Sequence, residues 1–173
     1  VNRFAHWSRR NTRRNSRRNI REHYDLSNDF YALWLDDSLT YSSALFRGKE
    51  SLQSAQENKY DRLCRKLDLQ PGMRVLEIGC GWGGFSLHAA RNFGVQVTAV
   101  TISDAQWQKA AERVAEAGLE GQIDVRLADY RELEGQYDAI VSIEMLEAVG
   151  HEFLHGYFDQ CHRLLKKEGR LGL

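Results

Sequence analysis

The stretch Val75-Leu76-Glu77-Ile78-Gly79-Cys80-Gly81-Trp82-Gly83-Gly84 decides how this chain of 173 residues folds. A short apolar run passes into a cluster of glycines, and an apolar helical pattern follows. This order predicts a buried strand, a tight turn and a helix whose N-terminus faces a ligand, because glycine lets the backbone turn sharply and come close to a bound group. The alternative is that the glycines make only a tight turn.

Strand and helix patterns continue to alternate after this stretch. We expect strands at 74–78, 95–102, 123–127, 137–143 and 170–173, and helices at 84–92, 103–118 and 153–165. On the last helix, Phe158 is expected on the buried face together with Tyr157 and Cys161. The alternation predicts an α/β domain with a parallel sheet covered by helices.

The chain divides into three segments by composition. Residues 1–23 form an arginine-rich basic arm, residues 24–70 a helical N-terminal segment, and residues 71–173 the α/β core. Helix starts are expected near Ser27 and Ser51. Because the chain starts at Val1 and stops at Leu173 inside a strand pattern, we expect a fragment whose C-terminal strands are missing.

Charge and cysteine content narrow the classes of protein. The net charge is zero, but the arm carries eight arginines against Glu22, a charge of +7, and residues 24–173 hold 16 basic and 23 acidic residues. Three dispersed cysteines without a C-x-x-C pair exclude a disulfide scaffold and argue against a zinc module. No apolar run reaches the roughly 18–20 residues of a membrane span. We therefore expect a cytoplasmic, soluble or peripheral protein.

The glycine turn suits two kinds of cofactor. A nicotinamide cofactor requires an acid at the end of the second strand, where this chain has Val100-Thr101-Ile102-Ser103. The acid is instead Glu77, before the first glycine. An acid followed by G-x-G-x-G resembles S-adenosylmethionine-dependent methyltransferases, whose loop passes under a cationic amino-acid group. Glu77, Gly79, Gly81 and Gly83 are therefore candidate cofactor-binding residues.

Several stretches together resemble the cyclopropane-fatty-acyl-phospholipid synthases and the mycolic acid cyclopropane synthases. They are Arg17-Arg18-Asn19-Ile20, His23-Tyr24-Asp25-Leu26-Ser27-Asn28-Asp29-Phe30, Leu39-Thr40-Tyr41-Ser42-Ser43-Ala44, Val75 to Phe85, Val100 to Ser103, and Met145-Leu146-Glu147-Ala148-Val149-Gly150. The resemblance covers roughly residues 17–170. It implies a Rossmann-like class I methyltransferase fold with an N-terminal helical extension.

The resemblance also assigns cofactor contacts in the N-terminal segment. Residues equivalent to Tyr24, Tyr41 and Ser42 reach S-adenosylmethionine in the family, which suggests that Tyr41 and Ser42 hold the methionine carboxylate. Packing and capping are their alternative roles.

Further contacts follow from the second and third strands. Thr101 and Gln106 carry over as ribose contacts, although Ser103 and Gln106 also have the spacing of a capping box. Asp129 carries over as an acceptor for the adenine amino group, and its alternative is a solvated loop acid.

In the family, an alkene attacks the sulfonium methyl, and the resulting carbocation loses a proton to a bound bicarbonate as the ring closes. Glu147 matches the family glutamate at the bicarbonate, and its alternative is a helix-start acid. Ser43 stands in the place of the usual cysteine and can still hydrogen-bond bicarbonate. Ala148 replaces a common histidine. Glu147 and Ser43 are the catalytic candidates, no metal is expected, and the product stays open between cyclopropane, methyl-branched and methylene forms.

The arginine arm repeats arginine pairs at 9/10, 13/14 and 17/18, so a helix would gather them on one face. An anionic membrane surface is the favoured partner. One alternative is that the arm is a solvated tail, and another is that it docks onto the acidic body of the chain. Nucleic acid is a further possible partner, but we do not expect it. We therefore expect the protein to lie in the cytoplasm, peripherally at the inner face of the cell membrane.

The predicted function is methyl transfer from S-adenosylmethionine to the double bond of an unsaturated phospholipid acyl chain, forming a cyclopropane fatty acid. The runner-up is a small-amine N-methyltransferase on the same core. A third hypothesis is a cofactor- or lipid-binding fragment without turnover. A homodimer is left open.

Overall fold

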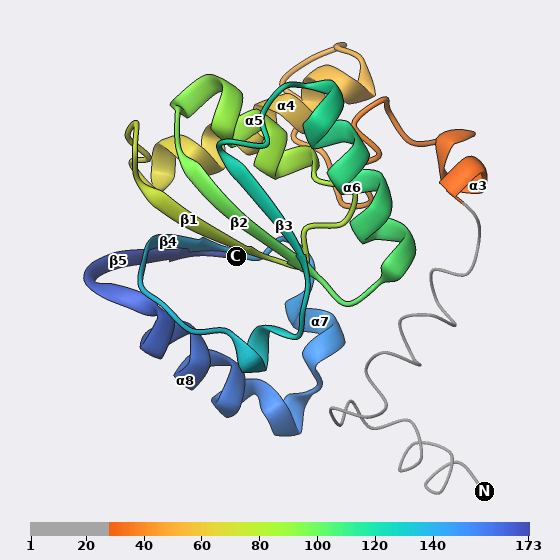
Figure 1. Ribbon diagram of the computed structural model, residues 1–173. Coiled ribbons are helices and arrows are strands. Elements are labelled where there is room, and N and C mark those ends of the chain that lie inside the picture. Colours follow the sequence, from red (N-terminus) through yellow and green to blue (C-terminus); the bar gives the residue numbers. More distant parts are fainter. Residues whose placement is uncertain (1–27) are drawn as a thin grey trace, which may run out of the picture.

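The computed structural model describes residues 28–173, which form one parallel sheet with helices on both faces (Figure 1). Its strands are β1 (Arg74–Ile78), β2 (Gln96–Thr101), β3 (Ile123–Leu127), β4 (Tyr137–Val141) and β5 (Leu165–Gly172). Their order across the sheet is β3-β2-β1-β4-β5, and each neighbouring pair is parallel. The predicted α/β class is thus confirmed. The arm of residues 1–23 and Tyr24 lie outside the described residues.

The helices are α3 (Asn28–Ala32), α4 (Leu52–Lys66), α5 (Gly84–Phe93), α6 (Asp104–Glu116), α7 (Leu146–Val149) and α8 (Leu154–Leu164), with 3₁₀ turns at Tyr130–Glu132 and His151–Phe153. Helices α4, α5 and α6 lie on one side of the sheet, and α8 lies on the other (Figure 1). Within residues 28–173, no helix is both long and apolar enough to cross a membrane.

Serine caps set the starts of two helices where the sequence predicts them. The Ser51 hydroxyl accepts from the Ser54 N–H at the start of α4, and the Ser103 hydroxyl accepts from the Gln106 N–H at the start of α6. Each cap satisfies one backbone N–H that the helix itself leaves unpaired. Local chemistry therefore sets where both helices start.

The alternation of side chains along β1 separates two apolar cores. Val75 packs into the cluster on the side of α4 and α5, whereas Leu76 and Ile78 pack with Tyr157 of α8. Successive strand residues point to opposite faces of a sheet, so Glu77 falls on the α5 side with Val75. The strand register therefore buries a carboxyl group beside α5.

Two predictions about the C-terminal part are wrong in detail. Strand β5 begins at Leu165 rather than Arg170, because Leu165 pairs with Tyr137 and the register then shifts before Arg170 pairs with Ala139. Phe158 is 43% exposed. The buried stripe of α8 runs through Tyr157, Cys161 and Leu164 at helical spacing, and Phe158 lies beside that stripe.

Gly84 at the start of α5 is a point of close approach between the N-terminal segment and the core. A Cβ atom there would lie 2.7 Å from Tyr60 Oη and 3.0 Å from Thr40 Oγ1. These two hydroxyls are hydrogen-bonded to each other at 2.6 Å and are buried, so neither moves away freely.

We therefore expect Gly84→Ala to lower the free energy of unfolding by about 1–3 kcal/mol through overpacking. The matched control is Gly121→Ala, where a Cβ atom meets nothing within 4 Å and the expected change is within about 0.5 kcal/mol. Urea denaturation measures both. Equal midpoints for the two variants would show that the contact at Gly84 is not tight.

Candidate functional site

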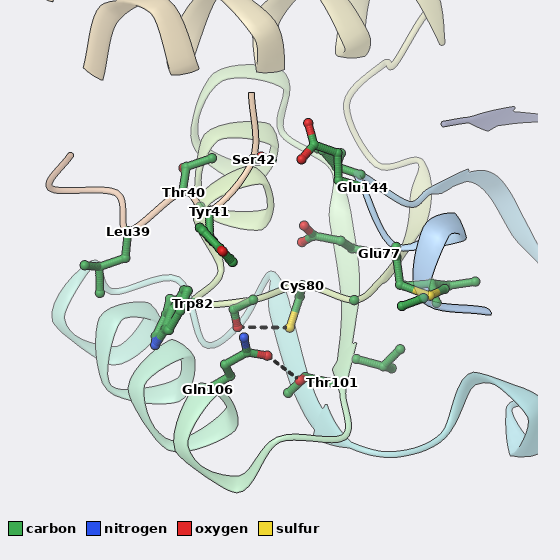
Figure 2. Close-up of a pocket in the computed structure, with 18 of the residues that line it drawn as sticks. Leu39, Thr40, Tyr41, Ser42, Glu77, Cys80, Trp82, Thr101, Gln106 and Glu144 are labelled. Carbon is green, nitrogen blue, oxygen red and sulfur yellow. Dashed lines mark hydrogen bonds between the residues drawn. The ribbon is translucent and has the colours of Figure 1, made fainter. Parts of the chain in front are cut away.

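A cavity of about 1160 Å³ opens at the carboxyl ends of β1, β2 and β4. The glycine turn forms its floor, and the loops after β2, β3 and β4 form its sides. Residues 34–46, called here the covering segment, contribute further lining residues that include Tyr41 and Ser42 (Figure 2). Ser43 of the same segment also lines the cavity. Ligands of open α/β sheets bind at this edge.

The glycine turn leaves room for a ligand at one point. Gly79 and Gly81 have φ values of +81° and +53°, which favour glycine. A Cβ atom at Gly79 would lie 3.0 Å from Met145 Cγ, whereas one at Gly81 would meet nothing within 4 Å. Gly83 is the N-cap of α5 and faces Ala110 instead of the cavity. Space for a ligand therefore lies above Gly81.

Glu77 lies at the end of β1 and is 4% exposed. Its Oε2 accepts a hydrogen bond from the Ser86 hydroxyl of α5. Burial raises the pKa of the Glu77 carboxyl to about 8, although Ser86 and the nearby Lys59 ammonium act in the opposite direction. A buried acid of this kind favours a cationic partner, because a nearby positive charge stabilises its ionised form.

Thr101 and Gln106 are joined at the end of β2. The Thr101 hydroxyl donates to Gln106 Oε1 at 2.9 Å, and the Ser103 N–H donates to Thr101 Oγ1 at 3.2 Å. In a complete capping box the Gln106 side chain would take that Ser103 N–H. Only half of the capping box is therefore formed, and the Gln106 side chain lines the cavity.

Asp129 follows β3 and is 6% exposed, so it is not a solvated loop acid. Its Oδ1 accepts from the Arg131 N–H at 3.0 Å and from Arg131 Nε at 2.9 Å, and its Oδ2 accepts from Arg131 Nη2 at 2.5 Å. The bidentate pair fixes the carboxylate at the wall of the cavity. Both residues line it.

Side chains of α4 hold the covering segment. Gln56 Nε2 donates to the Ser42 carbonyl at 2.8 Å. One turn later, Lys59 Nζ donates to Ser42 Oγ at 2.5 Å and to the Ser43 carbonyl at 2.9 Å. Tyr60 bonds Thr40, as described above. The position of Ser42 over the cavity is therefore set by α4.

Ser43 is joined to the core through Glu144, which follows β4. Its N–H donates to Glu144 Oε1 at 2.8 Å, and its hydroxyl donates to the same oxygen. Burial raises the pKa of Glu144, but these hydrogen bonds outweigh it and the pKa is lowered overall. Glu144 has φ +48°, an uncommon conformation for a residue other than glycine. The hydroxyl proton of Ser43 is thus already used in the hydrogen bond to Glu144.

Glu147 and Ala148 lie in α7 and line the cavity with exposed side chains. The catalytic candidates Glu147 and Ser43 therefore share one cavity with every cofactor-binding candidate of the described chain except Gly83. Within residues 28–173, no group of three or more His, Cys, Asp or Glu side chains is placed to hold a metal ion.

Sequence reasoning missed Lys59 and Glu144, whose partners are Ser42 and Ser43. A signal for Lys59 was present, because it lies at i+3 from Gln56 and next to buried Tyr60 on α4. Glu144 directly precedes the Met145–Gly150 stretch but carries no pattern of its own.

Known proteins match this chain closely. The cyclopropane-fatty-acyl-phospholipid synthase of Escherichia coli (strain K12) is 46% identical over 149 residues, which are 86% of this chain and 38% of that protein. The tuberculostearic acid methyltransferase UfaA1 of Mycobacterium tuberculosis is 41% identical over 162 residues, or 89% of this chain and 38% of the relative. The chain thus spans under half the length of these relatives.

A solved structure and a family model agree with these relatives. The mycolic acid cyclopropane synthase CmaA1, complexed with SAH and CTAB, superposes with a TM-score of 0.86 and 40% identity, covering 90% of this chain and 55% of that one. The agreement confirms the class I methyltransferase fold. The family model described as mycolic acid cyclopropane synthetase matches residues 11–173. This chain belongs to the mycolic acid cyclopropane synthetase family.

Proposed function

We propose that the protein transfers the methyl group of S-adenosylmethionine to the double bond of an unsaturated phospholipid acyl chain. The observation that carries this proposal is the buried Glu77 carboxyl group in a cavity formed between the glycine turn and the covering segment. One relative is named a cyclopropane-fatty-acyl-phospholipid synthase and another a "Probable fatty acid methyltransferase". The CmaA1 structure is named as a complex with SAH and CTAB.

The side chains of the cavity fit the parts of S-adenosylmethionine. Glu77 suits the ammonium group, and a hydroxyl donor at Ser42 suits the carboxylate. Thr101 and Gln106 are polar groups at the end of β2 for the ribose, and Asp129 is an acceptor for the adenine amino group. The volume of about 1160 Å³ exceeds the usual ligand pocket of about 300–1000 Å³, which leaves room for an acyl chain.

When bound, S-adenosylmethionine supplies an electrophilic methyl group. An alkene that accepts it becomes a carbocation, so the chain must exclude water and nucleophiles there. Ile143, Met145 and Phe153 provide apolar lining on the side of Glu147. We assign Glu147 to the site of proton removal.

Bicarbonate is proposed as the base, as in the family resemblance. The Ser43 hydroxyl donates to Glu144, so it presents a lone pair rather than a proton to an incoming anion. Ser43 would contact bicarbonate only by exchanging that hydrogen bond. Glu147 is therefore the stronger of the two catalytic candidates.

A membrane surface is the proposed location of the substrate. Leu33, Trp34 and Phe46 are exposed by 81%, 48% and 53%, and Trp34 and Phe46 line the cavity. Exposed apolar groups of this kind mark interaction surfaces, and the arginine arm adds charge suited to an anionic inner leaflet. The family match favours a lipid over a small amine as substrate. A homodimer stays a prediction from the sequence.

The first test follows the methyl group. The protein is incubated with labelled S-adenosylmethionine and liposomes of unsaturated phospholipid, and the fatty acids are analysed by mass spectrometry. We expect label in acyl chains that are heavier by one methylene. Label only in added soluble amines would contradict the proposal.

The second test concerns Glu147. Glu147→Gln should keep the dissociation constant for S-adenosylmethionine within about two-fold and lower turnover by about 100-fold or more, because the bicarbonate base is no longer held where it takes the proton. Glu120→Gln, an exposed acid in the turn before β3, is the control and should match the unchanged protein. Turnover that survives in Glu147→Gln removes this residue from the catalytic set.

The third test concerns the protonation of Glu77. Because its pKa is raised to about 8, the carboxyl is mostly protonated at about pH 7 and ionises when an ammonium group binds beside it, releasing up to about one proton. Calorimetry with S-adenosylhomocysteine in buffers of different ionisation enthalpy measures this release. Glu77→Gln should abolish it. Proton uptake, or equal release from both proteins, would contradict the assignment.

A further inference from the structure

We propose that Lys59 is a positioning residue for S-adenosylmethionine, holding the Ser42 hydroxyl so that it donates its proton to the carboxylate of the methionine end. The inference deepens the proposed function and rests on it. Lys59 lies on α4, outside the residues that line the cavity, and acts on the ligand through Ser42.

The direction of the hydrogen bonds sets what Ser42 can do. A lysine ammonium has three donors and no acceptor, so Ser42 Oγ must accept at the 2.5 Å contact with Lys59 Nζ. The proton of the Ser42 hydroxyl is then available for another acceptor. Since Ser42 lines the cavity, an anionic group there is a matching acceptor.

The backbone of Ser42 is fixed separately. Gln56 Nε2 donates to its carbonyl at 2.8 Å, and Lys59 Nζ also binds the Ser43 carbonyl at 2.9 Å. The main chain is therefore held by two side chains of one helix. What Lys59 adds beyond this is a defined orientation of the Ser42 hydroxyl and a positive charge behind it.

The charge of the cavity shows why an anion needs that support. Its described lining contains four acids, Glu77, Asp129, Glu144 and Glu147, and one basic side chain, Arg131, which is paired with Asp129. A carboxylate entering this lining meets repulsion unless a cation lies close. Lys59 is that cation at Ser42.

The surroundings of Lys59 are consistent with this role. Burial lowers its pKa to about 8, while Glu144, Asp36 and Glu77 act to raise it. The ammonium also lies 5.0 Å from the centre of the Tyr60 ring on the same helix. A further anion near Ser42 would favour the charged form of Lys59, so ligand and lysine stabilise each other.

The test compares two ligands that differ at the amino-acid end. S-adenosylhomocysteine carries the carboxylate, and methylthioadenosine lacks the whole amino-acid group. Calorimetry gives the dissociation constants of both for the unchanged chain, Lys59→Met and Lys66→Met, the last being an exposed lysine of the same helix. We expect Lys59→Met to raise the dissociation constant of S-adenosylhomocysteine by about ten-fold or more and to leave that of methylthioadenosine within about two-fold of its value in the unchanged chain. Lys66→Met should change neither.

If Lys59→Met raises the dissociation constants of both ligands equally, Lys59 only supports the fold. If both dissociation constants stay unchanged, Lys59 has no part in binding. Either result overturns the inference while leaving the proposed function in place. If the unchanged chain binds neither ligand, the proposed function itself fails.

Two further variants keep the inference testable if Lys59→Met does not fold. Ser42→Ala should give the same selective loss for S-adenosylhomocysteine, because it removes the group through which Lys59 acts. Lys59→Arg keeps the charge and should retain most of the preference for the carboxylate ligand. Unchanged affinity in Ser42→Ala overturns the inference.

Discussion

The sharp turn at the end of β1 is the constraint on which the site depends. Strand β1 lies between β2 and β4 in the sheet, and the chain leaves β1 into α5 on one face while β4 leads to α7 and α8 towards the other (Figure 1). Connections that part in this way leave a crevice at the carboxyl ends of the strands. The N–H groups of Gly79 and Cys80 both donate to the Val100 carbonyl at 3.0 Å, which attaches the turn to β2 at the edge of this crevice.

A ligand in this crevice can change the protonation of two side chains beside it, the Glu77 carboxyl group and the Lys59 ammonium group. The Glu77 carboxyl has a pKa raised to about 8 by burial, and the Lys59 ammonium has a pKa lowered to about 8 for the same reason. A buried acid is stabilised by a cation, and a buried base by an anion. An amino-acid group carries both charges, so one ligand end satisfies both residues. This complementarity explains why a site whose charged lining residues are mainly acids suits a zwitterionic end group.

Much of the fold follows from local sequence signals. The glycine turn, the serine caps at Ser51 and Ser103, and the alternation along β1 predict elements that the structure shows within a few residues. The start of β5 was misplaced because its pairing with β4 contains a register shift, which depends on the partner strand. Phe158 of α8 was wrongly expected to be buried, because the sequence alone does not show which edge of an apolar helix stripe faces the sheet.

The site was predictable in part for a related reason. Glu77 and Thr101 lie at the carboxyl ends of β1 and β2, and Asp129 follows β3. The carboxyl ends of parallel strands meet at one edge of the sheet. The contacts Lys59–Ser42 and Ser43–Glu144 join residues 17 and 101 positions apart. They depend on the path of the covering segment, which local patterns do not determine. The different hydrogen-bonding roles of the Ser42 hydroxyl, which accepts from Lys59, and the Ser43 hydroxyl, which donates to Glu144, therefore emerge only from the structure.

A crystal structure of the chain with S-adenosylhomocysteine tests the central claim most directly. The account predicts the ligand above Gly81, with its ammonium at Glu77, its carboxylate at the Ser42 hydroxyl and its adenine beside Asp129. A ligand bound in the reverse orientation, or outside this cavity, would contradict the account.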